Sequence, residues 1–294
     1  MTDTARAQDL EIITPQQKET YERDGYLVLP GLIHGGWLGR LREASDHFVE
    51  QSRALTRSDA LLDLEPDHTA ENPRLRRLTS PVDHHPTFEE FSLRGPVADL
   101  AIDLLGSPAR YHHSKLNYKW SAGGQAVEWH QDIQYWPHSD FTPLTIGVYL
   151  DDVDGAMGPM GILPGSHRGE IYDLYDGDKW TGSLTDEALA GLDLDDVVWL
   201  EGPAGSVTVH NACAVHGSPD NNSDRVRPLL LQTYSGAASY PLLGVGTNGR
   251  TGGLSGTLVG EGRPRWITVD GRRMPAAPDW SKGGYTTIFD QADL

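Results

Sequence analysis

Hydrophobic residues from position 111 onward fall into short runs separated by turn-forming residues. The run Leu144–Leu150 has apolar side chains at alternate positions, with Thr145 and Gly147 between them. A period of two is typical of a β-strand with one buried face. Several short strands at this spacing indicate a β-sandwich or barrel. The predicted strands are Tyr111–Lys119, Glu128–Gln134, Leu144–Leu150, Ile162–Leu163, Val197–Leu200, Ser206–His210 and Pro228–Ser235.

The beginning of the chain carries helix signals instead. Thr14 and Gln17 have the spacing of a capping box, and Pro15 fits the first helical position. Gly25 supplies a left-handed stop, which predicts a helix of about ten residues. The apolar run Tyr26–Leu29 then predicts a short strand.

Further helices are predicted from Gly36 to about Arg53, over Val97–Leu105 and, as an insertion among the strands, over Thr185–Leu192. Residues 54–95 are charged and interrupted by prolines, and His84 and His85 are expected to lie in a loop within this segment.

The 294 residues are expected to form a single domain, because β-barrel domains reach this length. Residues 1–110 are predicted to be a mostly helical part, 111–240 the β core, and 241–294 a glycine-rich loop with a C-terminal extension. The segment 244–262 holds eight glycines in nineteen positions. It is either a surface loop or a lid over an active site, and the sequence leaves both open.

Charge and cysteine content narrow the class of protein. The formal net charge of −18 repels nucleic acid and anionic lipid, so we expect neither as a partner. Cys213 is the only cysteine, which rules out a disulfide within the chain and a thiolate zinc site. Met1 to Leu10 carry no apolar h-region, so a secretory signal is not expected, and no apolar run approaches the roughly 20 residues that a membrane helix needs. These features predict a cytoplasmic protein.

The informative chemistry begins at His130 and Asp132, which stand two residues apart in a predicted strand and would project to the same face. A second histidine would complete a two-histidine, one-carboxylate triad, which suits non-haem iron(II) oxygenases. His216 lies 86 residues after His130 and is followed by Gly217 and Ser218. It is the predicted third ligand. His210 is a competitor, but it lacks the residues that follow His216.

Arg227 comes eleven residues after His216 and leads an alternating strand. Leu229, Leu231, Thr233 and Ser235 share its predicted face. A guanidinium that points into a barrel needs an anion, because a buried unpaired charge is very costly. The rigid fork of arginine suits a carboxylate. Two histidines, an aspartate and this arginine are therefore what a metal-chelated 2-oxo diacid would require.

With these motifs the sequence resembles the phytanoyl-CoA dioxygenase (PhyH-like) family of iron and 2-oxoglutarate oxygenases. The run His113–Lys119, and Trp136 four residues after Asp132, look like the ectoine hydroxylase branch. The stretches that carry the resemblance are Tyr21–Gly31, Trp129–Asp132, Gly161–His167, and His216–Ser218 with Asn222 and Arg227.

The resemblance implies a mainly β protein with flanking helices, in the double-stranded β-helix (jelly-roll, cupin-like) fold. It implies that His130, Asp132 and His216 are the catalytic residues and the ligands of Fe(II). By the family reaction, 2-oxoglutarate and O2 are consumed, succinate and CO2 are released, and an unactivated C–H bond of a small-molecule substrate is hydroxylated. Retention of Asp132 argues against the halogenating relatives, in which a small residue replaces this carboxylate.

The resemblance also implies a cosubstrate site. Arg227 and Ser218 would bind the far carboxylate of 2-oxoglutarate, and Asn117 would lie beside it. His113 stands where ectoine hydroxylase-like sequences carry glutamine, so it either contacts 2-oxoglutarate or fills space. Trp136 completes the predicted cofactor-binding set. The segment after Asp132 differs from the longer polar motif of ectoine hydroxylases, so ectoine is not inferred as the substrate, and a biosynthetic or amino-acid-like metabolite is expected.

Two alternatives remain at this stage. The same triad on the same barrel could bind zinc for hydrolase or lyase chemistry, although such an enzyme has no need of Arg227 and Ser218. A non-catalytic small-molecule binding module is the other. Epimerisation, desaturation and cyclisation can follow from the same iron chemistry as hydroxylation, and the oligomeric state cannot be read from the sequence.

Overall fold

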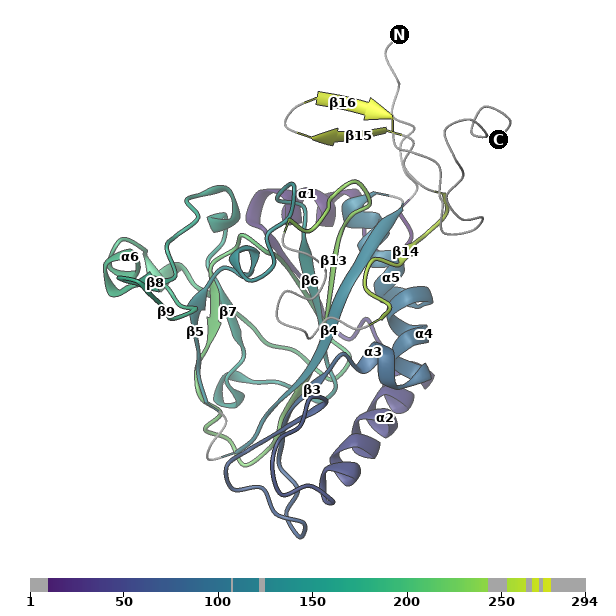
Figure 1. The fold of residues 1–294 in the computed structure, drawn as a ribbon, viewed down its shortest axis with the longest axis vertical. Coiled ribbons are helices and arrows are strands. Elements are labelled where there is room, and N and C mark those ends of the chain that lie inside the picture. Colours follow the sequence, from purple (N-terminus) through teal and green to yellow (C-terminus); the bar gives the residue numbers. More distant parts are fainter. Residues whose placement is uncertain are drawn as a thin grey trace.

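The strands of the protein form two main antiparallel sheets, the arrangement of a double-stranded β-helix (Figure 1). The computed structural model describes residues 10–106, 108–121, 125–242, 253–262, 266–269 and 272–275. Side chains from both sheets line one cavity, so the cavity lies between the sheets.

The larger sheet has the strand order β1-β11-β6-β13-β4-β3-β2, with β14 also paired to β4. The smaller sheet has the order β10-β7-β12-β5. The strands of the larger sheet are β1 (Tyr26–Leu29), β2 (Leu62–Leu64), β3 (Leu75–Thr79), β4 (Ala109–Lys119), β6 (Leu144–Tyr149), β11 (Val207–Asn211), β13 (Arg227–Gly236) and β14 (Leu258–Val259). Those of the smaller sheet are β5 (Val127–His130), β7 (Met160–Ile162), β10 (Val198–Leu200) and β12 (His216–Ser218). Two hairpins stand apart: β8 (Tyr175–Asp176) with β9 (Lys179–Trp180), and β15 (Trp266–Val269) with β16 (Arg272–Pro275).

The helices confirm the capping signals of the sequence. The Thr14 hydroxyl accepts a hydrogen bond from the Gln17 backbone amide at 3.2 Å, and Gly25 adopts φ 77° at the C-cap. The helices are α1 (Pro15–Asp24), α2 (Gly36–Ser52), α3 (Pro81–His84), α4 (Pro86–Arg94), α5 (Pro96–Leu105) and α6 (Asp186–Ala190). None of the helices within the described ranges is long and apolar enough to cross a membrane.

Helices α2, α4 and α5 lie along one side of the larger sheet (Figure 1). Their apolar faces share one core with the outward side chains of β4, β6, β11 and β13. On β6, Ile146 and Val148 belong to this core, whereas Thr145 lines the inner cavity and Gly147 lies opposite the inward-facing Leu231 of β13. All six residues of β6 are buried, so the prediction of one buried face was wrong, because the second sheet covers the other side.

Three other predictions need correction or fall outside the described residues. The segment 54–95 contains β2, β3, α3 and α4; His84 and His85, expected in a loop, are the last residue of α3 and the N-cap of α4. The predicted strand Glu128–Gln134 ends at His130, after which η1 (Asp132–Gln134) forms a 3-10 turn. Residues 243–252, which include the first nine positions of the glycine-rich segment 244–262, lie outside the described residues.

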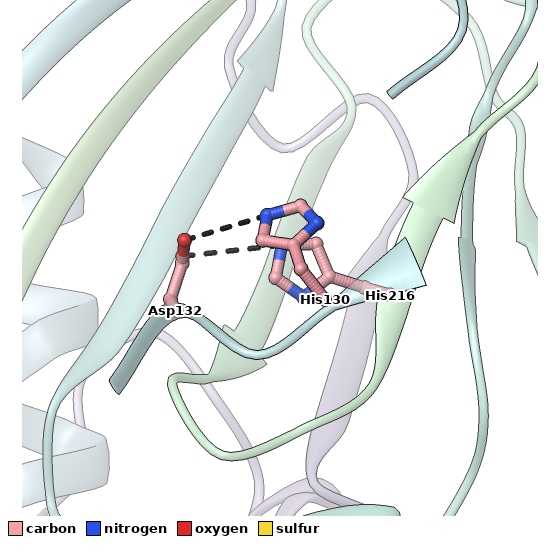
Figure 2. Close-up of side chains that lie close together, drawn as sticks. All are labelled: His130, Asp132 and His216. Carbon is pink, nitrogen blue, oxygen red and sulfur yellow. Dashed lines mark ion pairs between the residues drawn. The ribbon is translucent and has the colours of Figure 1, made fainter. Parts of the chain in front are cut away.

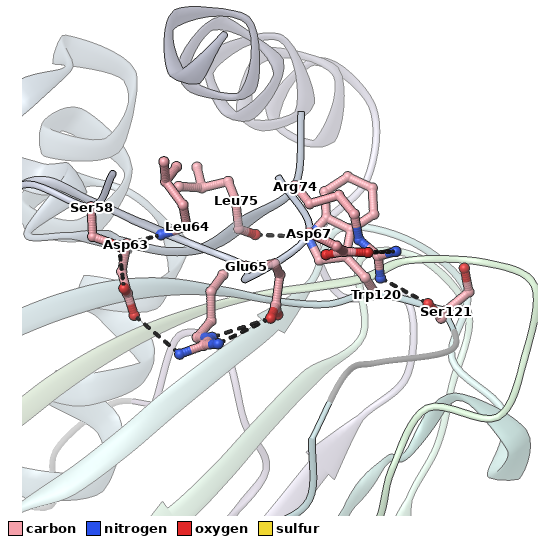
Figure 3. A network of polar contacts seen from close by, with 10 residues as sticks. Ser58, Asp63, Leu64, Glu65, Asp67, Arg74, Leu75, Trp120 and Ser121 are labelled. Atoms are coloured by element: carbon pink, nitrogen blue, oxygen red, sulfur yellow. Dashed lines mark hydrogen bonds and ion pairs between the residues drawn. The ribbon is translucent and has the colours of Figure 1, made fainter. Parts of the chain in front are cut away.

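A polar network fastens the β2–β3 hairpin to the end of β4 (Figure 3). The Arg74 guanidinium pairs with Asp67 at 2.7 Å and donates to the Ser121 carbonyl at 2.8 Å. The indole of Trp120 donates to the Leu75 carbonyl at 2.8 Å. These contacts hold β3 in register with β4, and this register places Arg77 opposite Asn117 at the cavity.

Candidate functional site

The two histidines of the predicted triad face each other across neighbouring strands. His130 ends β5, and His216 begins β12 directly opposite it in the antiparallel ladder. Their ring centroids are 4.2 Å apart. Side chains opposite each other in a ladder project from the same face of the sheet, which is why both imidazoles reach the cavity between the sheets.

Asp132 completes the cluster from η1, the turn that follows β5 (Figure 2). Its carboxylate oxygens lie 3.7 Å from the His130 Nε2 atom and 3.9 Å from the His216 Nε2 atom. One ligand atom from each of the three residues lies within 4.8 Å of the others. Because 3.7 and 3.9 Å exceed normal hydrogen-bond lengths, there is room between these atoms for a shared metal ion.

The backbone fixes which nitrogen of each imidazole faces the cluster. The Nδ1 atom of His130 lies 2.7 Å from the Glu128 carbonyl, and that of His216 lies 3.0 Å from the Ala214 carbonyl. A carbonyl can only accept, so each Nδ1 carries the proton and each Nε2 presents a lone pair. This is the tautomer that a metal ligand requires.

Electrostatics support the same protonation states. Burial, with the neighbouring His130 and His210, holds the pKa of His216 well below its ordinary value, so the ring is neutral. Burial alone would raise the pKa of Asp132, but the neighbouring imidazoles of His130, His210 and His216 and the charge of Lys115 hold it well below its ordinary value. A neutral imidazole beside an ionised carboxylate is the donor set of a divalent metal site.

His210, the competitor for the ligand position, lies on β11 of the larger sheet. Its Nε2 atom is 3.4 Å from the second carboxylate oxygen of Asp132. Among the described residues, the group that could hold a metal comprises His130, Asp132 and His216 and does not include His210. His210 thus contacts the carboxylate and helps to orient it.

Gln131, between the two ligands of the His-x-Asp motif, points away from the cavity and is completely buried. Its amide nitrogen donates to the Cys213 carbonyl at 2.7 Å and to the Glu170 carbonyl at 3.0 Å. Its oxygen accepts from the Tyr172 amide at 2.9 Å. The first of these bonds ties the turn that carries Asp132 to the segment that leads into β12, and the other two tie it to residues 170–172.

Arg227 lies at the other end of the same cavity, where it begins β13 opposite Lys119 of β4. It is 4% exposed, and its Nε and Nη1 atoms have no hydrogen-bond partner among the described residues. Burial lowers its pKa, and the Tyr149 hydroxyl is the neighbouring group that opposes this shift. An arginine buried in this way calls for an anionic ligand.

Ser218 lines the cavity near Arg227, and its hydroxyl accepts a hydrogen bond from the Lys119 ammonium at 2.7 Å. The hydroxyl proton is therefore free to be donated to a ligand. Burial, and then the charge of Arg227, lowers the pKa of Lys119 to about 7. Two cationic side chains and a hydroxyl thus meet at this end of the cavity.

Asn117 also lines the cavity, one step along β4 from Lys119 on the same face. Its side-chain oxygen accepts a hydrogen bond from the Arg77 Nε atom of β3 at 3.0 Å. This bond assigns the side-chain oxygen of Asn117 as an acceptor and leaves its amide nitrogen as a donor that a ligand could use.

His113 and Trp136, the other two predicted cofactor residues, are not among the residues that line this cavity. Their rings lie 5.7 Å apart, and the His113 Nδ1 atom is 2.7 Å from the His112 Nδ1 atom. The ladder between β13 and β4 shifts register here, so that His112 has no partner across it. A β-bulge of this kind re-aims side chains. The role of His113 and Trp136 in cofactor binding stays a prediction.

Sequence reasoning assigned no role to Lys115, Lys119 or Arg77. The signal that could have found the two lysines is the alternation along β4, where His113, Lys115, Asn117 and Lys119 occupy every second position. Arg77 lies on β3, a strand that the sequence did not predict, so its position could not be inferred.

Comparison with known proteins identifies the family. The phytanoyl-CoA dioxygenase (PhyH) family matches residues 21–229, which is most of the chain. The chain belongs to the PhyH family. It is therefore an enzyme, a 2-oxoglutarate-dependent dioxygenase with iron and 2-oxoglutarate as its cofactors. This membership favours the oxygenase over the zinc hydrolase and over the binding module.

Individual relatives of this PhyH protein include a probable alpha-ketoglutarate-dependent hypophosphite dioxygenase of Stutzerimonas stutzeri, 36% identical over 60% of the chain. That match spans 62% of the relative's own length. The L-proline trans-4-hydroxylase of Streptomyces griseoviridis is 27% identical over 76% of this chain and 87% of its own. The crystal structure of EctD from S. alaskensis with 2-oxoglutarate and 5-hydroxyectoine has a TM-score of 0.66 at 24% identity and covers 80% of each chain, which confirms the predicted fold.

Proposed function

We propose that this PhyH-family protein hydroxylates an unactivated C–H bond of a small-molecule substrate, with release of succinate and CO2. We assign His130, Asp132 and His216 as the iron ligands, and Arg227 with Ser218 as the site of the far carboxylate of 2-oxoglutarate. The observation that carries the proposal is that both groups of residues line a single cavity, with the metal cluster near one end and the buried arginine at the other.

The three proposed ligands fit iron by the chemistry of their donor atoms. Two neutral imidazole nitrogens and one carboxylate form a facial set that leaves adjacent positions open for a cosubstrate. His210 and Gln131, which contact Asp132 or anchor its turn, would limit movement of the carboxylate. Such outer contacts fix the orientation of metal ligands.

Arg227 fits a diacid cosubstrate because its Nε and Nη1 atoms are buried and unpartnered within the described part of the chain. A carboxylate can accept from both atoms at once, and charge-assisted bonds of this kind are the strong ones. The hydroxyl of Ser218 and the ammonium of Lys119 would add to the same anion site. When bound, iron and 2-oxoglutarate together activate O2 for oxidation of the substrate.

The chain's own contribution to the reaction is positioning. The three ligands are buried, with exposed fractions of 5 to 8%, so bulk water is largely kept from the metal site. Tyr135 lies with its ring 5.9 Å from that of His130 and is 41% exposed, which puts it at the edge where a substrate would enter. Holding the reacting C–H bond close and excluding water are the main tasks of the protein in such enzymes.

The substrate is proposed to be a small polar metabolite. L-proline and hypophosphite, named for two of the relatives, are both small and polar. We propose further that residues 1–294 act as one catalytic domain.

The function is tested by screening a metabolite library for compounds that stimulate succinate formation from 2-oxoglutarate in the presence of Fe(II), ascorbate and O2. The product formed under ¹⁸O2 should gain one labelled oxygen atom. A product that loses hydrogen without gaining oxygen, or one that is only inverted at a carbon centre, would contradict hydroxylation in favour of desaturation or epimerisation.

A further inference from the structure

Three aromatic side chains lie together at the edge of the metal site. Tyr135 follows the turn that carries Asp132, and its ring centroid is 5.9 Å from that of His130. Trp180 and Tyr175 come from the β8–β9 hairpin, which lies beside β5 at the left of Figure 1. We call Tyr135, Tyr175 and Trp180 the aromatic corner.

The rings of the aromatic corner meet nearly at right angles. The ring of Trp180 lies 5.3 Å from that of Tyr135 at an interplanar angle of 84°, and 5.1 Å from that of Tyr175 at 73°. All three residues are 39 to 43% exposed, although tryptophan is highly buried in most proteins. Ring faces that stand at right angles and are open to solvent can contact one ligand from two sides.

Hydrogen bonds fix the hairpin against the metal-binding segment. The Tyr135 hydroxyl donates to the Gly182 carbonyl at 2.7 Å, and the Leu184 amide donates to the Trp129 carbonyl at 2.8 Å. Gly182 has φ 73°, and a Cβ atom there would lie 2.3 Å from the Tyr135 hydroxyl oxygen. Only glycine therefore permits this contact. The aromatic corner is held next to His130 before any ligand binds.

The charge around the aromatic corner is opposite to that of Arg227 inside the cavity. Residues 170–196, the insertion that carries the hairpin and α6, hold nine acidic residues against one lysine, so they contribute −8 of the net charge of −18. Asp173, Asp176 and Asp178, the carboxylates nearest to the hairpin aromatics in the sequence, are exposed. Negative charge repels a dianion such as 2-oxoglutarate and attracts a cation. The aromatic corner is therefore distinct from the cosubstrate site.

Aromatic faces and negative charge together favour an organic cation. An ammonium group above an aromatic ring is attracted by the ring quadrupole, and tryptophan is the best of the aromatic residues for this contact. Trp180 stands at the centre of the aromatic corner, in contact with both tyrosines. A neutral apolar group would gain from the rings but would gain nothing from the carboxylates.

We propose that the aromatic corner determines substrate specificity by binding an organic ammonium group of the primary substrate. The inference rests on the proposed function, because it takes the exposed edge at Tyr135 as the place where the substrate enters. It adds a substrate class: small molecules with an ammonium group at one end and the C–H bond to be oxidised on the side of His130.

The test titrates choline and its neutral isostere 3,3-dimethylbutan-1-ol into protein loaded with Fe(II) and 2-oxoglutarate without oxygen, followed by calorimetry. Trp180→Leu removes the central ring, and Trp180→Phe retains an aromatic face. Trp199→Leu is the matched control, because Trp199 is 44% exposed and lies on β10, at the opposite edge of the smaller sheet from β5. Thermal melting of each variant verifies that it is folded.

Wild type should bind choline at least about five-fold more tightly than the neutral isostere, and Trp180→Leu should bind choline roughly 5- to 30-fold more weakly than wild type. Trp180→Phe should recover part of this affinity, and the control should match wild type. Affinity for 2-oxoglutarate should stay within about two-fold in every variant. Compounds that stimulate succinate formation should carry an ammonium group, and Trp180→Leu should raise their KM with little change in kcat.

Four results would overturn the inference: equal affinity for choline and the neutral isostere, choline affinity that survives in Trp180→Leu, wild type that forms the 2-oxoglutarate complex but binds no choline, or an active substrate without a cationic group. Failure of the proposed function looks different. In that case wild type would not bind 2-oxoglutarate with Fe(II) at all, before any choline is added.

Discussion

Replacing Arg227 by Met tests whether its buried guanidinium binds the far carboxylate of 2-oxoglutarate. The substitution keeps an apolar stem but removes a guanidinium that is 4% exposed and whose Nε and Nη1 atoms are unpartnered in the described part of the chain. A charge-assisted pair with a carboxylate contributes about 2–3 kcal/mol, which corresponds to a loss of about 30- to 150-fold in affinity for 2-oxoglutarate.

Anaerobic titration of the Fe(II)-loaded protein with 2-oxoglutarate, followed by its weak visible metal-to-ligand band, measures this affinity. Arg225→Met is the matched control, because Arg225 is exposed and pairs with Asp154 at 2.7 Å on the surface. The control should keep wild-type affinity, since exposed ion pairs contribute little.

The same substitution also tests how Arg227 affects the thermal stability of the unliganded protein, independently of cosubstrate binding. Because the guanidinium is buried without an anionic partner in the unliganded protein, its removal should leave the melting temperature unchanged or raise it. Unchanged affinity for 2-oxoglutarate together with a large drop in melting temperature would refute the reasoning, since Arg227 would then be a structural residue.

Four more outcomes can be checked on single variants. Burial and the charge of Arg227 lower the pKa of Lys119 to about 7, so the Kd for 2-oxoglutarate should rise as pH increases above that value and the ammonium is lost. Calorimetry should show this dependence in wild type and a flat profile in Lys119→Met, and a flat wild-type profile would contradict it. Gln131→Leu removes three hydrogen bonds behind the metal cluster and should weaken iron binding about 10- to 100-fold in a chelator competition, whereas wild-type affinity would show that the turn holds without it. Asp132→Ala should abolish succinate formation, and an active variant would remove this residue from the triad. Thr14→Ala should lower the free energy of unfolding by about 1 kcal/mol in urea, with activity preserved, because it removes a helix cap far from the cavity.

Features that depend on neighbouring residues in the sequence could be predicted well. The first helix follows from Thr14, Pro15, Gln17 and Gly25, all within the range of local hydrogen bonds, and the structure has the helix between those limits. The convergence of His130, Asp132 and His216 was also predicted, although the prediction relied on a family resemblance as well as on spacing.

The sequence could not reveal features set by distant parts of the chain. The strand predicted through Asp132 stops at His130 because the Ile133 amide bonds to the Ala212 carbonyl at 3.0 Å, a contact across nearly eighty positions. The buried inner side of β6 has the same cause, since the covering sheet comes from later segments.

The two lysines of the cavity, Lys115 and Lys119, were missed because their position also depends on a distant part of the chain. Alternation along β4 shows that Lys115 and Lys119 share a face, but only the pairing of β4 with β13 reveals that this is the inner one. A lysine on a strand is usually a solvated residue, so its burial had to be seen in three dimensions.

The central claim is that His130, Asp132 and His216 bind iron together with 2-oxoglutarate, and anaerobic absorption spectroscopy tests it most directly. Wild-type protein with Fe(II) and 2-oxoglutarate should develop the visible metal-to-ligand band, and His216→Ala should not. Wild-type protein that shows no band, and that retains stoichiometric zinc on metal analysis, would contradict the account.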